Sequence, residues 1–422
     1  MPTAAYVHIP FCRRRCFYCD FPVSVVGDRR HGENSGTIGQ YVKALCDEIR
    51  LTPVEIDRPL ETVFFGGGTP SLLSARQLQQ ILTVLQQRFG IAAGAEISIE
   101  MDPGTFDLTQ LQGYQIAGID RISLGVQAFQ DELLAKCGRS HTVAEIYAAV
   151  DLLHQAGVAN FSLDLISGLP HQSLAMWQDS LAQAIALSPP HLSLYDMILE
   201  PGTVFDRYYQ VGDEPLPTDE TAAEMYRTAQ QVLTAAGYLH YEVSNYARPN
   251  FQCRHNRTYW QNLPYYGFGM GATSYVRQQR FARPRTLAGY YQWLEGFAAS
   301  GGRIEAPVTS IEDELLESLM LGFRTADGVD LAAIADRWGA EIVDRIWQCW
   351  QPYADQGWVE VVGVKQSDVV PGSIDRPISG QLRLSDPEGF LFSNTLLSAL
   401  FAQLETADRS INSNATMNAT TN

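Results

Sequence analysis

The stretch YVHIPFCRRRCFYC, residues 6–19, places three cysteines directly after a short apolar run. Their spacing is Cys12-x3-Cys16-x2-Cys19, and the other four cysteines of the chain are scattered: Cys46, Cys137, Cys253 and Cys349. Thiolates crowded on one loop can hold a small metal centre. An iron–sulfur cluster usually takes one thiolate per iron, so three thiolates on a [4Fe–4S] cluster leave one iron open to a small molecule. A zinc site with His8 as a further ligand, or three unliganded cysteines, are the alternatives.

Composition excludes several classes of protein. The chain has 422 residues, 45% of them hydrophobic and 18% charged, which is enough for about two to three folded domains. Its 47 acidic and 30 basic residues give a net charge of −17, which disfavours nucleic acid as a partner because nucleic acid needs a basic surface. No run approaches the ~18 apolar residues of a transmembrane helix.

The N-terminal segment and the cysteines indicate a location. Met1–Phe11 lacks the basic start and the apolar core of a secretory signal. The cysteine count of seven is odd, and the distribution fits a reducing compartment better than a disulfide framework. We therefore expect a cytoplasmic protein.

Short apolar runs alternate with helical patterns between about residues 4 and 237. Apolar residues appear on both faces of these runs, as in parallel strands buried on both sides. One intervening helix places Leu78, Ile81, Leu82, Leu85 and Phe89 on one face. The strand-like runs are residues 4–10, 61–68, 96–103, 121–129, 160–170 and 191–202. This α/β repeat predicts a parallel sheet, either doubly wound or, as we favour, a partial (β/α)6 barrel with its site at the carboxyl ends of the strands.

The rest of the chain reads as a second, smaller unit. Helical stretches at 311–323, 330–338 and 340–356 precede strand-like residues 357–363 and 381–386 and a helix at 388–404. This order predicts a small α+β, winged-helix-like C-terminal domain with a hairpin tip at 364–380. The expected divisions are 1–245 for the barrel, 246–285 for a connecting segment, 286–405 for the C-terminal domain and 406–422 for a disordered tail.

The cysteine spacing after the first strand of a β/α repeat resembles the radical S-adenosylmethionine (SAM) superfamily, whose fold is a partial (β/α)6 barrel. That resemblance implies that Cys12, Cys16 and Cys19 hold a [4Fe–4S] cluster whose unique iron binds SAM. The strings YVHIPFC (6–12), FGGGTP (65–70), SLGVQAF (123–129) and DLISGLP (164–170) are similar to one branch of the superfamily. This branch holds the oxygen-independent coproporphyrinogen III dehydrogenase and the heme chaperone HemW.

A set of SAM contacts is implied by the same resemblance. Taken alone, the glycine run allows close approach to the backbone but also suits a plain tight turn, and polar residues at strand ends are often ordinary loop residues. A buried Arg or Asp usually has a ligand or partner. The resemblance implies that Tyr18 packs on the adenine side of SAM. The alternative is that its ring only packs within the protein. The residues implied to contact SAM are Tyr6, Gly67, Gly68, Thr69, Glu100, Gln127, Arg139 and Asp164.

The string HNRTYW, residues 255–260, resembles the HNxxYW motif of HemW, whose histidine is implicated in heme binding. Imidazole is a common axial ligand of heme iron, and the aromatic residues between Tyr259 and Phe268 suit a flat macrocycle. A structural histidine beside aromatics is the alternative, and Cys253 is a rival ligand. The resemblance thus implies His255 as the heme ligand.

Two departures separate the chain from the dehydrogenase. That enzyme has a fourth cysteine in CxxxCxxCxC, where Phe21 stands here, and a long N-terminal extension, whereas the first strand here begins by residue 4. We therefore expect a heme chaperone without dehydrogenase activity, whose partners are heme, heme-accepting proteins and a reductant for the cluster, and which forms a homodimer. The alternative is the dehydrogenase, which cleaves SAM reductively to start decarboxylation of a porphyrinogen propionate. A third alternative is a relative in the same branch that methylates its substrate with SAM.

Overall fold

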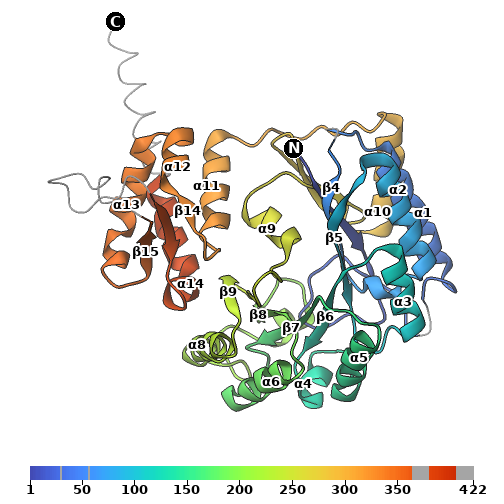
Figure 1. The fold of residues 1–422 in the computed structure, drawn as a ribbon, viewed down its shortest axis with the longest axis horizontal. Helices are drawn as coiled ribbons and strands as arrows, with labels where there is room; N and C mark the ends of the chain where they lie inside the picture. The colour runs from blue at the N-terminus through green and yellow to red at the C-terminus, as the bar shows by residue number, and fades with distance from the viewer. Residues whose placement is uncertain (29–30, 56–57, 364–379, 405–422) are drawn as a thin grey trace, which may run out of the picture. The chain divides into compact units, whose positions relative to one another are not determined.

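The computed structural model describes residues 1–28, 31–55, 58–363 and 380–404 (Figure 1). The predicted hairpin tip, apart from Gly380, and the predicted disordered tail lie outside the described residues. The chain divides into two compact units. One contains Met1–Leu239, Ser244–Tyr259 and Leu263–Thr309, and the other contains His240–Val243, Trp260–Asn262 and the described residues from Ser310 onward.

Eight strands of a nine-stranded sheet organise the first unit. All of the predicted strands are present: β1 (Ala4–Ile9), β4 (Leu60–Gly67), β5 (Ile91–Met101), β6 (Arg121–Gln127), β7 (Phe161–Ser167) and β8 (His191–Asp196). They are parallel neighbours in this order. The prediction of a partial barrel is confirmed.

Three short strands at the two edges of this sheet were not predicted. β11 (Tyr266–Phe268) pairs in parallel with β1. At the other edge, β10 (Asn245–Ala247) runs antiparallel to β8, and β9 (Leu239–Glu242) follows it in the sheet order. Each has only three or four residues, too few for an alternating pattern to stand out in the sequence.

Helices cover the outer face of the curved sheet, as Figure 1 shows. In α2, Ser74 and Gln77 form a capping box at the start, and Leu78, Ile81, Leu82, Leu85 and Phe89 are all buried, as their spacing predicts. The covering helices are α1 (Gly36–Leu51), α2 (Ala75–Phe89), α3 (Leu108–Ala117), α4 (Asp131–Lys136), α5 (Val143–Gln155), α6 (Leu174–Ala186) and α8 (Asp219–Ala235).

The two faces of the parallel sheet differ, which corrects the expectation that both are apolar. Outer-face residues such as Val63, Phe65, Ile97 and Ile99 belong to the buried core. Because side chains alternate across a strand, the residues between them face the barrel interior. These are largely polar: Tyr6, His8, Thr62, Glu96, Ser98, Glu100, Arg121, Ser123, Ser162, Asp164, His191 and Ser193. The string EISIE (96–100) already shows this alternation, which the many Ile and Leu residues of the other runs obscured.

A buried polar network fixes the glycine-rich segment after β11. The Arg283 Nε donates to the Glu48 carboxylate at 2.8 Å, and both side chains are buried. The backbone N–H of Gly269 donates to the same carboxylate at 2.8 Å. Tyr41, on α1, donates its hydroxyl to the backbone oxygen of His8 at 2.7 Å. A Cβ on Gly269 would lie 2.3 Å from the Tyr41 hydroxyl, so this approach to β1 requires glycine.

The second unit is a small α+β domain, as predicted. Its helices α11 (Ile311–Gly322), α12 (Leu331–Trp338) and α13 (Ala340–Ala354) precede two antiparallel strands, β15 (Val359–Val362) and β16 (Gln381–Leu384). The short strand β14 (Val329–Asp330) pairs with the other edge of β16. The turn α14 (Glu388–Leu391) and a helix over residues 393–404 follow. Within the described ranges, no helix is long and apolar enough to cross a membrane.

Candidate cofactor site at the carboxyl ends of the strands

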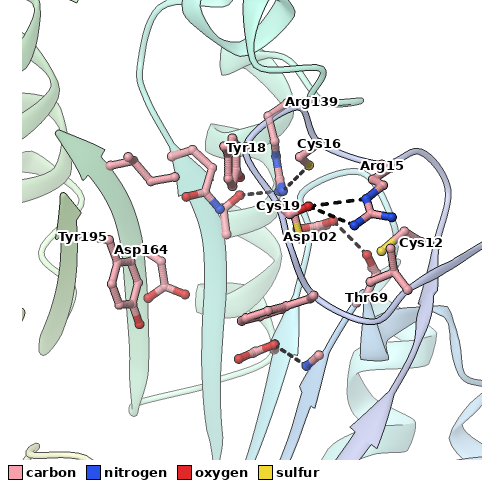
Figure 2. A pocket seen from close by; sticks show the side chains of 18 of the residues that line it. Cys12, Arg15, Cys16, Tyr18, Cys19, Thr69, Asp102, Arg139, Asp164 and Tyr195 are labelled. Atoms are coloured by element: carbon pink, nitrogen blue, oxygen red, sulfur yellow. Dashed lines mark hydrogen bonds and ion pairs between the residues drawn. The ribbon is translucent and has the colours of Figure 1, made fainter. Parts of the chain in front are cut away.

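The loop after β1 carries the clustered cysteines to the carboxyl end of the sheet. Cys12 belongs to β2 (Phe11–Cys12), which pairs in parallel with β3 (Ser24–Val25) and so closes the loop that contains Cys16 and Cys19. All three cysteines line one cavity of about 390 Å³, and Figure 2 shows them on the same side of it. The three predicted cluster ligands therefore share one site.

The free thiols are not arranged as a metal site as they stand. Among the residues that the structure describes, no three His, Cys, Asp or Glu side chains lie close enough together to hold a metal ion. Burial raises the pKa of Cys12 to about 12 and that of Cys19 to about 11. Because thiolate is the form that binds metal, these thiols would have to lose their protons to hold a cluster.

The glycine run at the end of β4 is required by close packing. Gly67 has φ +117°, a conformation that other residues rarely adopt, and a Cβ there would lie 2.5 Å from the His8 ring. A Cβ on Gly68 would lie 2.7 Å from the backbone oxygen of Phe11 and 2.9 Å from the Cys12 Sγ. Glycine at both positions therefore lets the backbone pack directly against His8 and the start of the cysteine loop, and both glycines line the cavity.

Tyr6 and His8 lie beneath this glycine run. The Tyr6 hydroxyl and His8 Nδ1 are 3.0 Å apart, and His8 Nε2 is 3.1 Å from the backbone oxygen of Pro22. Burial lowers the pKa of His8 to about 4. With both ring nitrogens engaged, His8 supports the cysteine loop and offers nothing to the zinc alternative. Tyr6 is the one predicted SAM contact that does not line the cavity.

Glu100, at the end of β5, faces the cavity. Its Oε2 accepts a hydrogen bond from the backbone N–H of Gly67 at 2.9 Å. Burial is the main cause that raises its pKa to about 8, and the nearby carboxylates of Asp164 and Asp102 add to it. A carboxyl group held neutral in this way has a strong tendency to ionise beside a cation.

Asp102 is a site residue that the sequence analysis missed. Its carboxylate forms an ion pair with the Arg139 guanidinium and accepts from the Thr69 hydroxyl at 3.0 Å. Arg139 also donates from Nη1 to the Cys16 Sγ at 3.4 Å. The signal was present in the sequence, because Asp102 stands two residues after Glu100 within the predicted strand-like run 96–103, where residues two apart share a face.

Asp164 lies on β7 in a cage of hydroxyl groups. Its oxygens accept from Ser123 Oγ at 2.8 and 3.0 Å and from Ser162 Oγ at 3.0 Å. Burial raises its pKa. Gln127, with φ +69°, stands at an irregularity in the pairing of β6 with β7 and also lines the cavity. Ionisable and polar groups from successive strands thus meet in one place.

The structure brings all but one of the predicted SAM contacts to the cavity, together with Tyr18. Further lining residues come from the end of β8 and the segment after it, where Tyr195, Asp196, Ile198 and Glu200 border the cavity. The sequence predicts a strand over 191–202 but no site residue in it. Tyr195 and Asp196 end a run of alternating polar and apolar residues, HLSLYD, which is the signal that was available.

His255 lies elsewhere, in α9 (Arg254–Trp260) on the interior side of the sheet, and is fully buried. Its Nδ1 is 2.8 Å from the Thr62 hydroxyl and its Nε2 is 2.8 Å from the Tyr259 hydroxyl. The ring stacks on Phe64 at a centroid distance of 5.2 Å. Burial lowers its pKa to about 3. Both ring nitrogens are therefore engaged within the protein.

Cys253, the rival heme ligand, is also fully buried. Its Sγ lies 3.6 Å from Glu96 Oε1, and Glu96 accepts from the backbone N–H groups of Arg254 and His255 at 3.1 and 3.0 Å. Glu96 thereby caps the start of α9 from within the barrel. The residues of this motif therefore contact side chains on the interior side of the sheet, and they do not line the cavity that contains the cysteines.

Comparison with known protein families gives two matches. Residues 6–184 match the model of the radical SAM superfamily, and residues 310–363 match that of the HemN C-terminal domain. A solved structure of the coproporphyrinogen III oxidase HemN from Escherichia coli, a radical SAM enzyme, is similar with a TM-score of 0.76 at 24% identity, over 94% of this chain and 90% of that chain. At this identity the likeness concerns the fold alone.

Sequence relatives are more similar. The heme chaperone HemW of Synechocystis is 51% identical over 405 residues, which are 96% of this chain and 98% of the relative. HemW of Escherichia coli is 42% identical over 275 residues, or 64% of this chain and 69% of the relative. A mouse mitochondrial protein, radical S-adenosyl methionine domain-containing protein 1, is 34% identical over 78% of this chain and 74% of its own.

Proposed function

The chain belongs to the HemW family of the radical SAM superfamily, and from this premise we propose that it is a heme chaperone. It binds heme and delivers it to acceptor hemoproteins, while its barrel holds a [4Fe–4S] cluster and SAM. The observation that carries the proposal is the cavity at the carboxyl end of the sheet. There the clustered thiols, the bare glycine backbone and the buried acids lie together, in a chain matched along 96% of its length by a heme chaperone.

The residues of the cavity fit the two cofactors. Cys12, Cys16 and Cys19 would hold the cluster, which supplies single electrons and an open iron position when bound. Gly67 and Gly68 let the backbone pack against the His8 ring and the cysteine loop, and both residues line the cavity. SAM carries a sulfonium and an ammonium group, and the carboxyl groups of Glu100 and Asp164 are placed to balance that charge.

The arginine of the cavity acts on the cysteine loop. The guanidinium of Arg139 puts a positive charge next to the Cys16 sulfur and donates a hydrogen bond to it. Asp102 and the backbone oxygen of Gly125, which accepts from Arg139 at 2.9 Å, fix the direction of the guanidinium. These residues therefore prepare one ligand of the cluster.

Dehydrogenase activity gains no support beyond the shared fold. Phe21 stands where the dehydrogenase motif carries its fourth cysteine, and the similarity to HemN is at 24% identity. We propose that the cavity does not convert coproporphyrinogen III.

The role of His255 in heme binding requires an opening of α9. Heme iron would need one ring nitrogen, and both are hydrogen-bonded inside the barrel. If the rate at which heme iron binds His255 is limited by release of the imidazole from its hydrogen bonds, Thr62→Val should increase that rate, because it removes the partner of Nδ1. The rate is followed by the change in the heme absorption band when iron binds the imidazole. His255→Ala should abolish that change, and Cys253→Ala should leave it intact. An unchanged band in His255→Ala would exclude this ligand.

Location and partners complete the proposal. All seven cysteines are free thiols, as suits a reducing compartment, and we propose that the chain acts in the cytoplasm. Besides heme and the acceptor, a reductant for the cluster and a second copy of the chain are proposed partners.

Delivery is tested by the kinetics of heme transfer. The full chain, loaded with heme, is mixed with increasing amounts of a heme-free hemoprotein whose holo form has a distinct absorption band. A chaperone that hands over heme in a complex gives a transfer rate that rises with acceptor concentration. The control is heme release to an excess of a heme trap. A transfer rate independent of acceptor concentration and equal to that release rate would show that the chain only stores heme.

A further inference from the structure

We propose that heme docks on the rim of the cysteine-lined cavity, with one face of the macrocycle on Phe21, Tyr195 and Ile198 and its propionates on Arg14 and Arg15. The inference rests on the proposed function and assigns to it a binding surface. All of these residues line the mouth of the cavity.

The rim is apolar and open, whereas the floor of the same cavity is polar. The exposed fraction is 49% for Phe21, 45% for Tyr195 and 64% for Ile198. Exposed apolar patches that are rimmed by polar residues mark interaction sites and ligand-binding grooves. Below them, Glu100 and Asp164 supply carboxyl groups that suit a cation. The mouth therefore suits a flat apolar ligand, and the floor suits SAM.

Two arginines supply the opposite charge to propionates. Arg14 pairs with Asp28 at 2.8 Å, with the two side chains 61% and 52% exposed, and such surface pairs contribute little to stability. A propionate can therefore replace Asp28 at little cost. Arg15 donates to the backbone oxygen of Cys19 at 3.2 and 3.3 Å, which leaves its positive charge in place. The planar guanidinium group suits a carboxylate.

The distribution of charge fixes the orientation of the ligand. Asp196, the last residue of β8, and Glu200, in the segment after it, both line the cavity, so they repel propionates. Figure 2 shows Arg15 and Tyr195 on opposite sides of the cavity. The propionate edge of heme should thus lie over the cysteine loop, and the apolar edge should lie over Tyr195 and Ile198.

This surface also needs no opening of the fold. His255 is fully buried with both ring nitrogens engaged. The rim is already exposed and is continuous with the cofactor cavity. A ligand arriving from solution therefore meets the rim before it can reach α9.

The test is a titration of the cluster-loaded full chain with heme, followed by absorption, with iron content measured for each variant. Ile198→Asp and the double variant Arg14→Glu, Arg15→Glu should each weaken heme binding by at least about tenfold. The matched controls are Ile116→Asp and Arg76→Glu. Ile116 is 84% exposed and Arg76 is exposed, and neither lines the cavity, so both controls should bind as the parent does.

Heme dimethyl ester probes the propionates directly. The parent should bind it more weakly than heme, and the arginine double variant should lose this preference. Ile198→Asp lies outside the cysteine loop, so it keeps the test valid if the arginine variants lose the cluster. If the parent binds heme and all rim variants bind it equally well, the docking surface is wrong while the proposed function stands. If the parent binds no heme, the proposed function itself fails.

Discussion

Arg139 and Cys16 are joined by a hydrogen bond of 3.4 Å from Nη1 to Sγ, although 123 residues separate them in the chain. The same guanidinium forms an ion pair with Asp102. One side chain from the segment between α4 and α5 thus contacts both Asp102, directly after β5, and the cysteine loop. A single charge therefore acts on a residue that we assign to the cluster.

Removing this charge should lower the reduction potential of the cluster. A reduced cluster is more negative than an oxidised one, so a neighbouring cation favours reduction. Arg139→Gln should shift the midpoint to a more negative value, on the order of 50 mV, with the iron content retained. The measurement is a redox titration followed by electron paramagnetic resonance. Arg139→Lys keeps the charge and should restore most of the potential, whereas equal potentials in all three proteins would exclude this role.

The cysteine assignment is tested by iron and sulfide content after anaerobic reconstitution. We expect about four irons and four sulfides per chain, because three thiolates hold a [4Fe–4S] cluster in this arrangement. Cys12→Ala, Cys16→Ala and Cys19→Ala should each lose the cluster. Cys46→Ala, Cys137→Ala and Cys349→Ala are the controls and should keep it. Full iron content in Cys16→Ala would refute the assignment.

Asp164 should contribute to SAM affinity. Its carboxylate accepts hydrogen bonds from Ser123 and Ser162, and it is placed to accept from an amine or a ribose hydroxyl as well. Asp164→Ala should weaken SAM binding by about tenfold or more, since a charge-assisted hydrogen bond is worth ~1.5–3 kcal/mol. Calorimetry on cluster-loaded protein measures this. The control is Asp120→Ala, which removes a carboxylate that does not line the cavity. Equal SAM affinities for the two variants would count against a SAM contact at Asp164.

The raised pKa of Glu100, about 8, predicts a pH-dependent stability. The unfolded carboxyl group ionises near its usual pKa, while the folded one stays protonated up to about pH 8. Between these values the folded state binds more protons, so its free energy of unfolding falls as pH rises. Glu100→Gln should therefore be more stable than the parent at pH 8, by roughly 1–3 kcal/mol, and nearly equal to it at pH 4.5.

Thermal unfolding of the cofactor-free chain at the two pH values measures this difference. Glu132→Gln, at an exposed position, is the matched control and should show no such change with pH. The prediction fails if the stability gain of Glu100→Gln is the same at both pH values.

Much of the barrel was predictable from sequence, because the strand runs and the amphipathic helices have clear periods. The cysteine loop and the glycine run carry local signals, and they meet because neighbouring parallel strands end at one edge of the sheet. Asp102 was missed although its register with Glu100 is visible in the sequence. The burial of His255 could not be predicted, since Thr62 is 193 residues away and only the folded sheet brings it to the ring.

The most direct test of the chaperone assignment is a heme titration of the anaerobically reconstituted full chain, with a coproporphyrinogen III assay on the same sample. We predict about one heme per chain with the cluster iron retained, and no SAM-dependent formation of protoporphyrinogen IX under reducing conditions. Substantial SAM-dependent product together with absence of stoichiometric heme binding would contradict the assignment.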